Sequence, residues 1–266
     1  MTIAKGKVVY SIGTPPCCGT GQSLTSDELD EAITGSVVAT VFDDVGKTEV
    51  VELLLLVLAE TEFKKELIEE ILSRPDAIED WRVGEGLAEV YLTDHYKCTF
   101  PWPDSRDERK SGSSLPGADL VGFQLDGSGD RFAFGEIKTS TERRYPPGTM
   151  HGRTGLKHQL EDLRDKVWTR NKLVEYLGFR AISAPWKNRY IAAFKRYAKS
   201  KTDVALFGVM IRDVEPHSDD LRVRVEKLTL DIQPEMNITL LALYLPKDSI
   251  PQLRPKVLAT HAGRMS

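Results

Sequence analysis

Three residues near the middle of the chain have the types and the spacing that could hydrolyse a phosphodiester bond. Glu136 and Lys138 lie two positions apart at the end of a predicted strand, so their side chains project from the same face. Asp119 stands at the start of the predicted strand before it. We expect the two carboxylates and the Ile137 carbonyl to supply oxygen ligands for Mg²⁺ or Mn²⁺. A lysine beside such a site can orient or deprotonate a water and stabilise charge on a phosphate.

The context of this Glu-x-Lys spacing distinguishes it from two others in the chain. The same spacing occurs at Glu62–Lys64 and at Glu108–Lys110. Neither of those pairs ends an apolar predicted strand that follows a strand carrying an aspartate. The alternative interpretation of Glu136 and Lys138 is an ordinary strand end with a charged pair on the surface.

The arrangement resembles the PD-(D/E)xK superfamily of nucleases, also called restriction-endonuclease-like. The family pattern has an acidic residue on the first core helix, an aspartate on the second strand and Asp/Glu-x-Lys on the third. The resemblance covers about residues 80–245. It implies that Asp119 and Glu136 hold the metal and that Lys138 is the catalytic lysine. The proline of the family name stands three positions before the aspartate, at Pro116, instead of directly before it.

The resemblance also points to a helix acid and to a glutamine. Glu85 and Glu89 lie four positions apart and therefore on one face of a predicted helix. We favour Glu85, because an acidic residue after a glycine at the helix start resembles many members. Gln159 stands on the helix after the lysine strand, where several subfamilies carry a glutamine that faces the active site. The alternative for each is a solvent-facing helix residue.

Two windows that lack acidic residues, 143–158 and 185–201, are candidates for holding a phosphate backbone. They carry four and six Lys or Arg residues, respectively. A solvated loop and a solvated helix face are the alternative. We expect the aromatic residues of the second window, Tyr190, Phe194 and Tyr197, to be core contacts. The residues expected to bind DNA are Arg143, Arg144, Arg153, Lys157, Lys187 and Arg189.

The predicted helices and strands that must position these residues indicate an α/β fold, with a central mixed sheet flanked by helices. Hydrophobic periodicity predicts helices over residues 26–33, 48–73, 85–95, 156–177 and 185–200. Residues 13–21, 101–116 and 143–154 are predicted loops. Strands are predicted over residues 7–12, 37–42, 118–125, 131–138, 204–211, 221–230 and 238–245.

The charge distribution suggests two functional regions. Residues 1–75 contain 6 Lys/Arg and 13 Asp/Glu, a net charge of −7, whereas the remainder contains 30 and 27, a net charge of +3. We expect residues 1–75 to be an acidic accessory region that regulates the nuclease or docks a partner. Residues 80–245 would form the nuclease domain, and residues 246–266 a C-terminal tail.

Composition and motifs exclude several classes of protein. With 41% hydrophobic and 29% charged residues, the 266-residue chain is not collagen-like, low-complexity or fully disordered. No apolar run approaches the ~18–20 residues of a membrane span. The first residues lack the basic-then-apolar order of a signal peptide, and three cysteines do not make a disulfide framework, so we expect a cytoplasmic protein without membrane contact. The chain lacks a Walker A motif, so any unwinding would require a separate helicase or ATPase subunit.

These observations predict a metal-dependent nuclease that hydrolyses DNA. The short Gly-Glu and Gly-Glu-x-Lys strings also look like those of nuclease subunits of bacterial anti-phage systems, including the Hachiman type that partners a helicase. That likeness implies a role in defence or restriction. The alternatives are a nuclease fold that only binds DNA or a protein, a DNA repair nuclease, and another enzyme in which Glu-x-Lys is incidental. The sequence leaves a homo-oligomer open.

Overall fold

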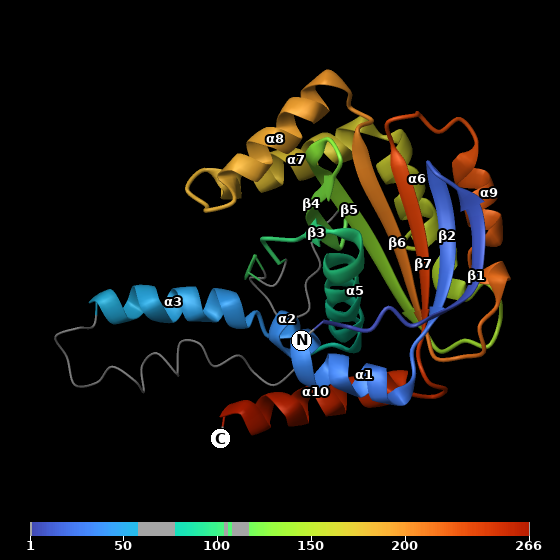
Figure 1. The fold of residues 1–266 in the computed structure, drawn as a ribbon, viewed down its shortest axis with the longest axis horizontal. Coiled ribbons are helices and arrows are strands. Elements are labelled where there is room, and N and C mark those ends of the chain that lie inside the picture. Colours follow the sequence, from blue (N-terminus) through green and yellow to red (C-terminus); the bar gives the residue numbers. More distant parts are fainter. Residues whose placement is uncertain (1, 58–77, 104–105, 108–116, 266) are drawn as a thin grey trace.

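A seven-stranded mixed sheet forms the centre of the molecule, in the order β1-β2-β7-β6-β5-β4-β3 (Figure 1). The computed structural model describes residues 2–57, 78–103, 106–107 and 117–265. The inner strands β2, β7, β6 and β5 run parallel, and β1, β4 and β3 pair antiparallel toward the edges. The predicted α/β class with a central mixed sheet is confirmed. The strands are β1 (Lys7–Thr14), β2 (Cys17–Ser23), β3 (Cys98–Thr99), β4 (Leu120–Asp126), β5 (Gly129–Ser140), β6 (Val204–Arg212) and β7 (Asn237–Tyr244).

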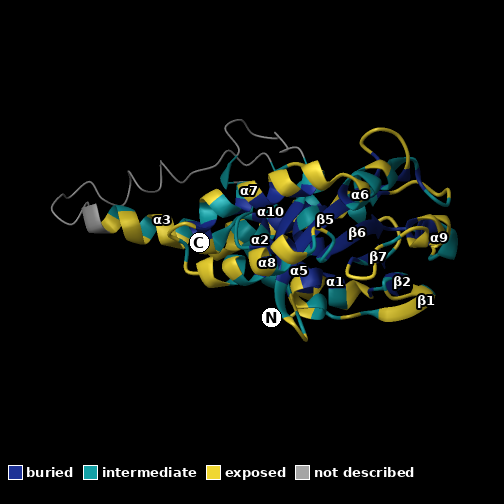
Figure 2. Cartoon of the chain, turned by 90° about the horizontal axis from the view of Figure 1, so that it is seen from above, coloured by how far each residue is buried: buried dark blue, intermediate teal, exposed yellow. Residues whose placement is uncertain are grey.

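Helices cover both faces of this sheet, and the strands between them are buried along most of their length (Figure 2). The helix α3 (Asp44–Val57) extends away from the sheet (Figure 1). A separate hydrophobic core lies on each face of the sheet. The core on one face is covered by α1 (Ser26–Ala32), the π-helical turn η1 (Ile33–Val37), α2 (Val38–Val41), α5 (Asp80–Tyr96) and α10 (Ile250–Met265). The opposite face carries α6 (Leu156–Asp165), α7 (Val167–Ala181), α8 (Lys187–Lys199) and α9 (Arg222–Thr229).

Successive side chains of β5 point alternately to the two helical layers that cover the sheet. Phe132 and Phe134 belong to the core under α6, α7 and α8, whereas Ala133 and Ile137 belong to the core under α5. Because side chains alternate along a strand, Glu136 projects toward the layer that contains α6.

Two predicted strands are helices in the structure. Residues 37–42 end η1 and form α2, where Val38 and Val41 are buried against the core that includes α5. Residues 221–230 contain α9, and Leu221 at its N-cap, Val225 and Leu228 are buried at helical spacings of four and three. In both segments, burial of an apolar face overrides the β preference of valine, which depends strongly on context.

Two further segments differ from prediction. The predicted loop 13–21 contains the end of β1 and most of β2, whose glycines allow close packing: a Cβ at Gly21 would lie 2.5 Å from Cε1 of Tyr10. The predicted single helix 156–177 is two helices, α6 and α7, broken at Lys166. The buried Arg170 side chain donates from Nη1 to the carbonyls of Leu163 and Arg164 and so satisfies the end of α6. The predicted helix 48–73 is present as α3 up to Val57, and its remainder lies outside the described residues.

The N-terminal segment is part of the main sheet. β2 pairs with β7 from Cys17–Ile238 to Ser23–Tyr244, and α1 and α2 share a core with α5. Residues 7–41 of the expected accessory region are therefore built into the same sheet and core as residues 80–245, whereas α3 extends away from them. The predicted tail 246–266 contains α10, whose Lys256 pairs with Asp30 of α1 at 2.5 Å. Among the described residues, no helix has both the length and the apolar character to cross a membrane.

Candidate active site

The strand β5 continues beyond its partner β4 and leaves an open edge at the candidate site. β4 pairs with β5 from Leu120–Gly135 to Asp126–Gly129, so residues 136–140 pair only with β6. Asp119 lies directly before β4 at this edge. Its Oδ2 accepts a hydrogen bond of 2.7 Å from the Ile137 amide. This bond brings together the two predicted metal carboxylates, which stand 17 positions apart in the sequence.

The Ile137 carbonyl faces the same edge. In a strand, the N–H and C=O of one residue point to the same side. The Ile137 amide points toward Asp119, so its carbonyl also points away from β6. A backbone oxygen is therefore available beside the Asp119 carboxylate, as the sequence predicts for a metal ligand.

Glu136 and Lys138 form a close pair. The Lys138 Nζ donates to Glu136 Oε1 at 2.6 Å and lies 4.0 Å from Asp119 Oδ2. The Glu136 side chain is fully buried, and its Oε2 has no hydrogen-bond partner among the described residues. Burial raises the pKa of Glu136 to about 8, with a further increase from the negative charge of Asp119 and an opposing effect from Lys138. A buried carboxylate oxygen without a partner is a position that a cation would satisfy.

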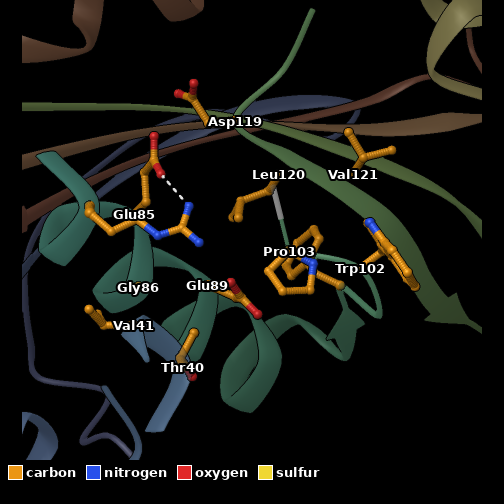
Figure 3. A pocket seen from close by; sticks show the side chains of 12 residues that line it. Thr40, Val41, Glu85, Gly86, Glu89, Trp102, Pro103, Asp119, Leu120 and Val121 are labelled. Atoms are coloured by element: carbon orange, nitrogen blue, oxygen red, sulfur yellow. Dashed lines mark hydrogen bonds and ion pairs between the residues drawn. The ribbon is translucent and has the colours of Figure 1, made fainter. Parts of the chain in front are cut away.

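Glu85 lies on the helix that borders this edge. Its side chain extends from α5 toward Asp119, and both residues line a small pocket beside Trp102 (Figure 3). Both also line an open cleft of about 790 Å³, which Lys138 shares. Glu89 lines the small pocket beside Trp102 but not the open cleft. Of the two helix acids that the sequence spacing left as alternatives, the structure thus brings Glu85 into the cleft with Lys138. Arg82, which sequence reasoning missed, lies 3.4 Å from Glu85 through Nη1 and Oε2.

The cleft lies at the carboxyl ends of the parallel strands, between the start of α5 and the start of α10. In open α/β sheets, this edge is where ligands bind. The other residues that line the cleft are Glu79, Asp80, Trp81, Ile137, Ile250 and residues 139–142.

Gln159 lies on the helix that covers Glu136. α6 packs over β6 so closely that a Cβ at Gly208 would lie 2.6 Å from Cδ1 of Leu160. Gly208 is the register partner of Glu136 on the neighbouring parallel strand. Gln159 precedes Leu160, and its Oε1 is buried without a hydrogen-bond partner in the described part of the chain. α6 therefore brings a second buried, unpartnered oxygen to the layer into which Glu136 projects.

The structure separates the two basic windows. Arg143, Arg144 and Arg153 are exposed on the segment that follows β5, and Lys157 lies in the first turn of α6. In contrast, Arg189 Nη2 pairs with Asp130 Oδ1 at 2.7 Å, at the opposite end of β5. Asp130 stands eight residues before Lys138, about 26 Å at ~3.3 Å per residue.

Lys187 and Arg189 are therefore not brought to the candidate site, whereas the segment 143–157 begins beside it. The prediction that all three aromatic residues of α8 are core contacts is wrong for one of them. Tyr197 is fully buried and Tyr190 partly buried, but Phe194 remains 43% exposed, because it lies on the outward face of α8.

Sequence reasoning also missed Arg212, at the end of β6. Its buried guanidinium donates to the carbonyls of Ser140 and Arg144, and Nε pairs with Asp220 at 3.2 Å. Arg212 thus fixes the start of the basic segment relative to β5. The available signal was an arginine at the end of an apolar strand, which did not by itself indicate this role.

The oxygen atoms available at the site suit a magnesium ion that keeps some of its waters. They do not form a site in which the described residues supply every ligand. Among the described residues, no three His, Cys, Asp or Glu side chains are grouped closely enough to hold an ion. Mg²⁺ commonly uses one or two carboxylates and completes its shell with waters and substrate phosphates. Asp119, Glu136 and the Ile137 carbonyl match that requirement.

No protein-family model matches this sequence, and the search of curated proteins finds no match either. The functional argument consequently depends on the geometry of the site.

Proposed function

We propose that this chain is a metal-dependent nuclease that hydrolyses DNA phosphodiester bonds. The observation that carries the proposal is the hydrogen bond from the Ile137 amide to Asp119, which places the aspartate against the Glu136-Ile137-Lys138 segment. The order of elements supports it. Glu85 lies on the helix before three antiparallel strands, Asp119 precedes the second of these, and Glu136 and Lys138 lie on the third. This order agrees with the one that the PD-(D/E)xK resemblance implies.

The residues of the site have distinct roles in this proposal. Asp119, Glu136 and the Ile137 carbonyl would hold Mg²⁺ or Mn²⁺, and Glu85 reaches from α5 into the cleft that Asp119 and Ile137 line. A bound metal supplies a water of lowered pKa and neutralises charge on the phosphate. The Lys138 ammonium, between the two carboxylates and the cleft, orients the attacking water and stabilises negative charge on the phosphate. Arg143 and the basic residues that follow it hold the DNA backbone.

We further propose a cytoplasmic role in bacterial anti-phage defence or restriction, with a helicase or ATPase subunit as partner. The support comes from the sequence, which resembles such nuclease subunits and lacks a Walker A motif of its own.

Cleavage of supercoiled plasmid and linear duplex tests the nuclease proposal. The full chain would be assayed with Mg²⁺, Mn²⁺ or EDTA, beside Lys138→Ala. Lys227→Ala is the matched control, because Lys227 is an exposed lysine on α9, away from the cleft. We expect nicking or degradation that requires metal, is lost in Lys138→Ala and persists in Lys227→Ala. Cleavage that persists in Lys138→Ala would contradict the assignment.

A titration with Mn²⁺ covers the case in which the isolated chain does not cleave. Binding that disappears in Asp119→Asn would support a metal site whose activity depends on the partner. Wild-type protein that neither cleaves nor binds metal at Asp119 would overturn the proposal and favour a nuclease fold that only binds DNA or a protein.

A further inference from the structure

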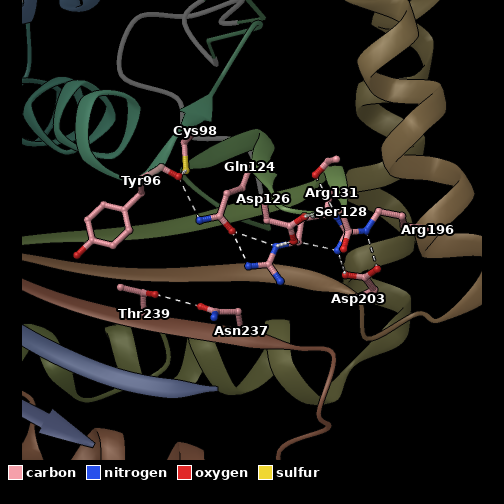
Figure 4. Close-up of polar contacts among 11 residues, drawn as sticks. Tyr96, Cys98, Gln124, Asp126, Ser128, Arg131, Arg196, Asp203, Asn237 and Thr239 are labelled. Carbon is pink, nitrogen blue, oxygen red and sulfur yellow. Dashed lines mark hydrogen bonds and ion pairs between the residues drawn. The ribbon is translucent and has the colours of Figure 1, made fainter. Parts of the chain in front are cut away.

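The arginines of α8 are occupied in ion pairs that fasten the helix to the β4–β5 hairpin. Arg196 Nη1 pairs with Asp126 Oδ1 at 2.7 Å, and its Nε pairs with Asp203 Oδ2 at 2.8 Å (Figure 4). Arg189 pairs with Asp130 in the same region. These contacts hold α8 in a fixed orientation, with one face turned toward solvent.

The lysines of the helix are used differently. Lys187, Lys195 and Lys199 are exposed, and none has an ion-pair partner within the described ranges. The surrounding window 185–201 contains no acidic residue. The outward face of α8 therefore carries positive charge that the described residues leave unneutralised, and this charge is complementary to a polyanion.

Apolar side chains lie among these lysines. Ile191 is 39% and Phe194 43% exposed, and both share the outward face with Lys187 and Lys195 at spacings of three and four residues. One side of the Phe194 ring is supported by Tyr190, with ring centroids 6.0 Å apart and planes within 13°. The tyrosine fixes the orientation of a ring that still has exposed area for a further stacking partner.

We infer that the outward face of α8 binds a single-stranded segment of nucleic acid. Lys187, Lys195 and Lys199 would contact phosphates, and a base would stack on Phe194. Aromatic platforms flanked by cations are typical of surfaces that bind single strands without sequence preference, because every base has a π-face. Duplex DNA offers phosphates to the lysines but keeps its bases stacked inside, so it leaves the phenyl ring unused.

The position of α8 defines how this surface relates to cleavage, and this step rests on the proposed nuclease function. The β4–β5 hairpin under α8 is about 26 Å from Lys138 along β5. α8 therefore holds the strand well away from the scissile bond, and its contacts are separable from catalysis.

Fluorescence anisotropy with a labelled oligothymidylate tests the inference directly. An oligonucleotide of about 20 nucleotides is longer than the ~16 nucleotides that the largest single-strand sites of one OB fold cover. The full chain would be titrated in EDTA, so that the measurement does not depend on cleavage. We expect Phe194→Leu, which keeps an apolar side chain but removes the ring, to weaken binding roughly 5- to 150-fold, the range that corresponds to loss of one stacked base. Phe194→Tyr should restore it.

The salt dependence of the same titration tests the lysines. Neutralising Lys187 and Lys195 together should make the slope of log K against log salt shallower by about 1.4, or ~0.7 for each phosphate that no longer meets a lysine. Lys227→Ala, on α9, is the control and should leave affinity and slope unchanged. Unchanged thermal unfolding midpoints would show that the variants fold.

Three results would overturn the inference. The first is an oligothymidylate affinity and salt slope that none of the α8 variants changes, as expected if the face binds a protein instead. The second is an equal loss of duplex affinity in Phe194→Leu, which would contradict base stacking. The third is loss of oligothymidylate binding in Lys227→Ala. Failure of the nuclease proposal is distinguishable, because it would abolish metal-dependent cleavage while leaving the Phe194 effect on binding intact.

Discussion

The Asp119 carboxylate accepts a hydrogen bond of 2.7 Å from the Ile137 backbone amide. Asp119 therefore has a structural role in addition to the metal-binding role that we propose for it. The bond fixes the end of the loop before β4 against the part of β5 that has no β4 partner. A substitution that preserves this bond can separate the two roles.

We expect Asp119→Asn and Asp119→Ala to differ in stability but not in metal binding. The asparagine Oδ1 can still accept from the Ile137 amide, so the free energy of unfolding should stay close to that of the wild type. Alanine leaves that amide unpaired, which should cost about 1–3 kcal/mol. Both variants should lose Mn²⁺ binding, because neither retains the carboxylate. Urea denaturation and calorimetric titration measure the two effects, and wild-type metal affinity in Asp119→Asn would contradict the assignment.

The Glu136 carboxyl predicts a pH dependence of stability in the absence of metal. Its pKa is raised from 4.5 to about 8 by burial and by the charge of Asp119, against the effect of Lys138. Between those values, the folded protein keeps a proton that the unfolded chain releases. The free energy of unfolding should therefore fall as the pH rises through this range, by up to about 1.4 kcal/mol per unit.

Glu136→Gln removes this titration, and we expect a flatter stability profile in EDTA between about pH 4.5 and about pH 8. Urea denaturation of both proteins across this range provides the measurement. The difference between them should grow in favour of the variant as the pH increases. Parallel profiles would show that Glu136 titrates at its ordinary pKa in the folded protein.

The sequence predicted the hairpin that carries the candidate site because the alternation of side chains along a strand depends only on neighbouring residues. The alternation around Glu136 and Lys138, with the Asp-Gly turn before them, was sufficient to predict the β4–β5 hairpin and its shared face. Neighbouring residues in the sequence could not distinguish Glu85 from Glu89, since both lie on one side of α5. Only the packing of α5 against the open edge of β5 brings Glu85 into the cleft with Lys138.

The failures of prediction have a common cause. Val38 and Val41 in α2, and Val225 in α9, are β-branched residues in short helices that are buried by tertiary contacts. Their conformation depends on what packs against them, which a single sequence does not show. The separation of Lys187 from Arg143 is likewise a consequence of the direction of β5, along which the two basic windows lie at opposite ends.

Arg212 should be important for stability, although it lies outside the cleft. Its side chain and that of Asp220 are both fully buried, and the guanidinium also holds the Ser140 and Arg144 carbonyls. Arg212→Met leaves the carboxylate in a buried position without its cation, which should destabilise the fold by about 3–5 kcal/mol.

The exposed pair of Arg222 and Asp219 offers a matched control for this effect. Arg222→Met should change stability far less than Arg212→Met, because exposed ion pairs contribute little. Chemical denaturation of the two variants gives the comparison. Equal effects would mean that the Arg212 network does not stabilise the start of the basic segment in the way we describe.

The position of Glu85 depends on a close approach of α5 to β5 at the preceding residue. A Cβ at Gly84 would lie 2.2 Å from Oγ1 of Thr139, so Gly84→Ala requires the helix or the threonine to move. We expect a loss of about 1–3 kcal/mol from overpacking, together with reduced metal-dependent cleavage as Glu85 shifts. Thr139→Ala removes the clashing hydroxyl and leaves the Thr139 Cβ and the Ile211 Cδ1, each 3.5 Å from the new methyl group.

The double variant with Gly84→Ala and Thr139→Ala should therefore recover most of both losses, a coupling that a double-mutant cycle measures. Stability is read from urea denaturation and activity from plasmid nicking. Recovery of stability without recovery of nicking would show that Glu85 does not depend on this contact for its position. Additive losses in the double variant would show that the helix and strand do not meet at these two residues.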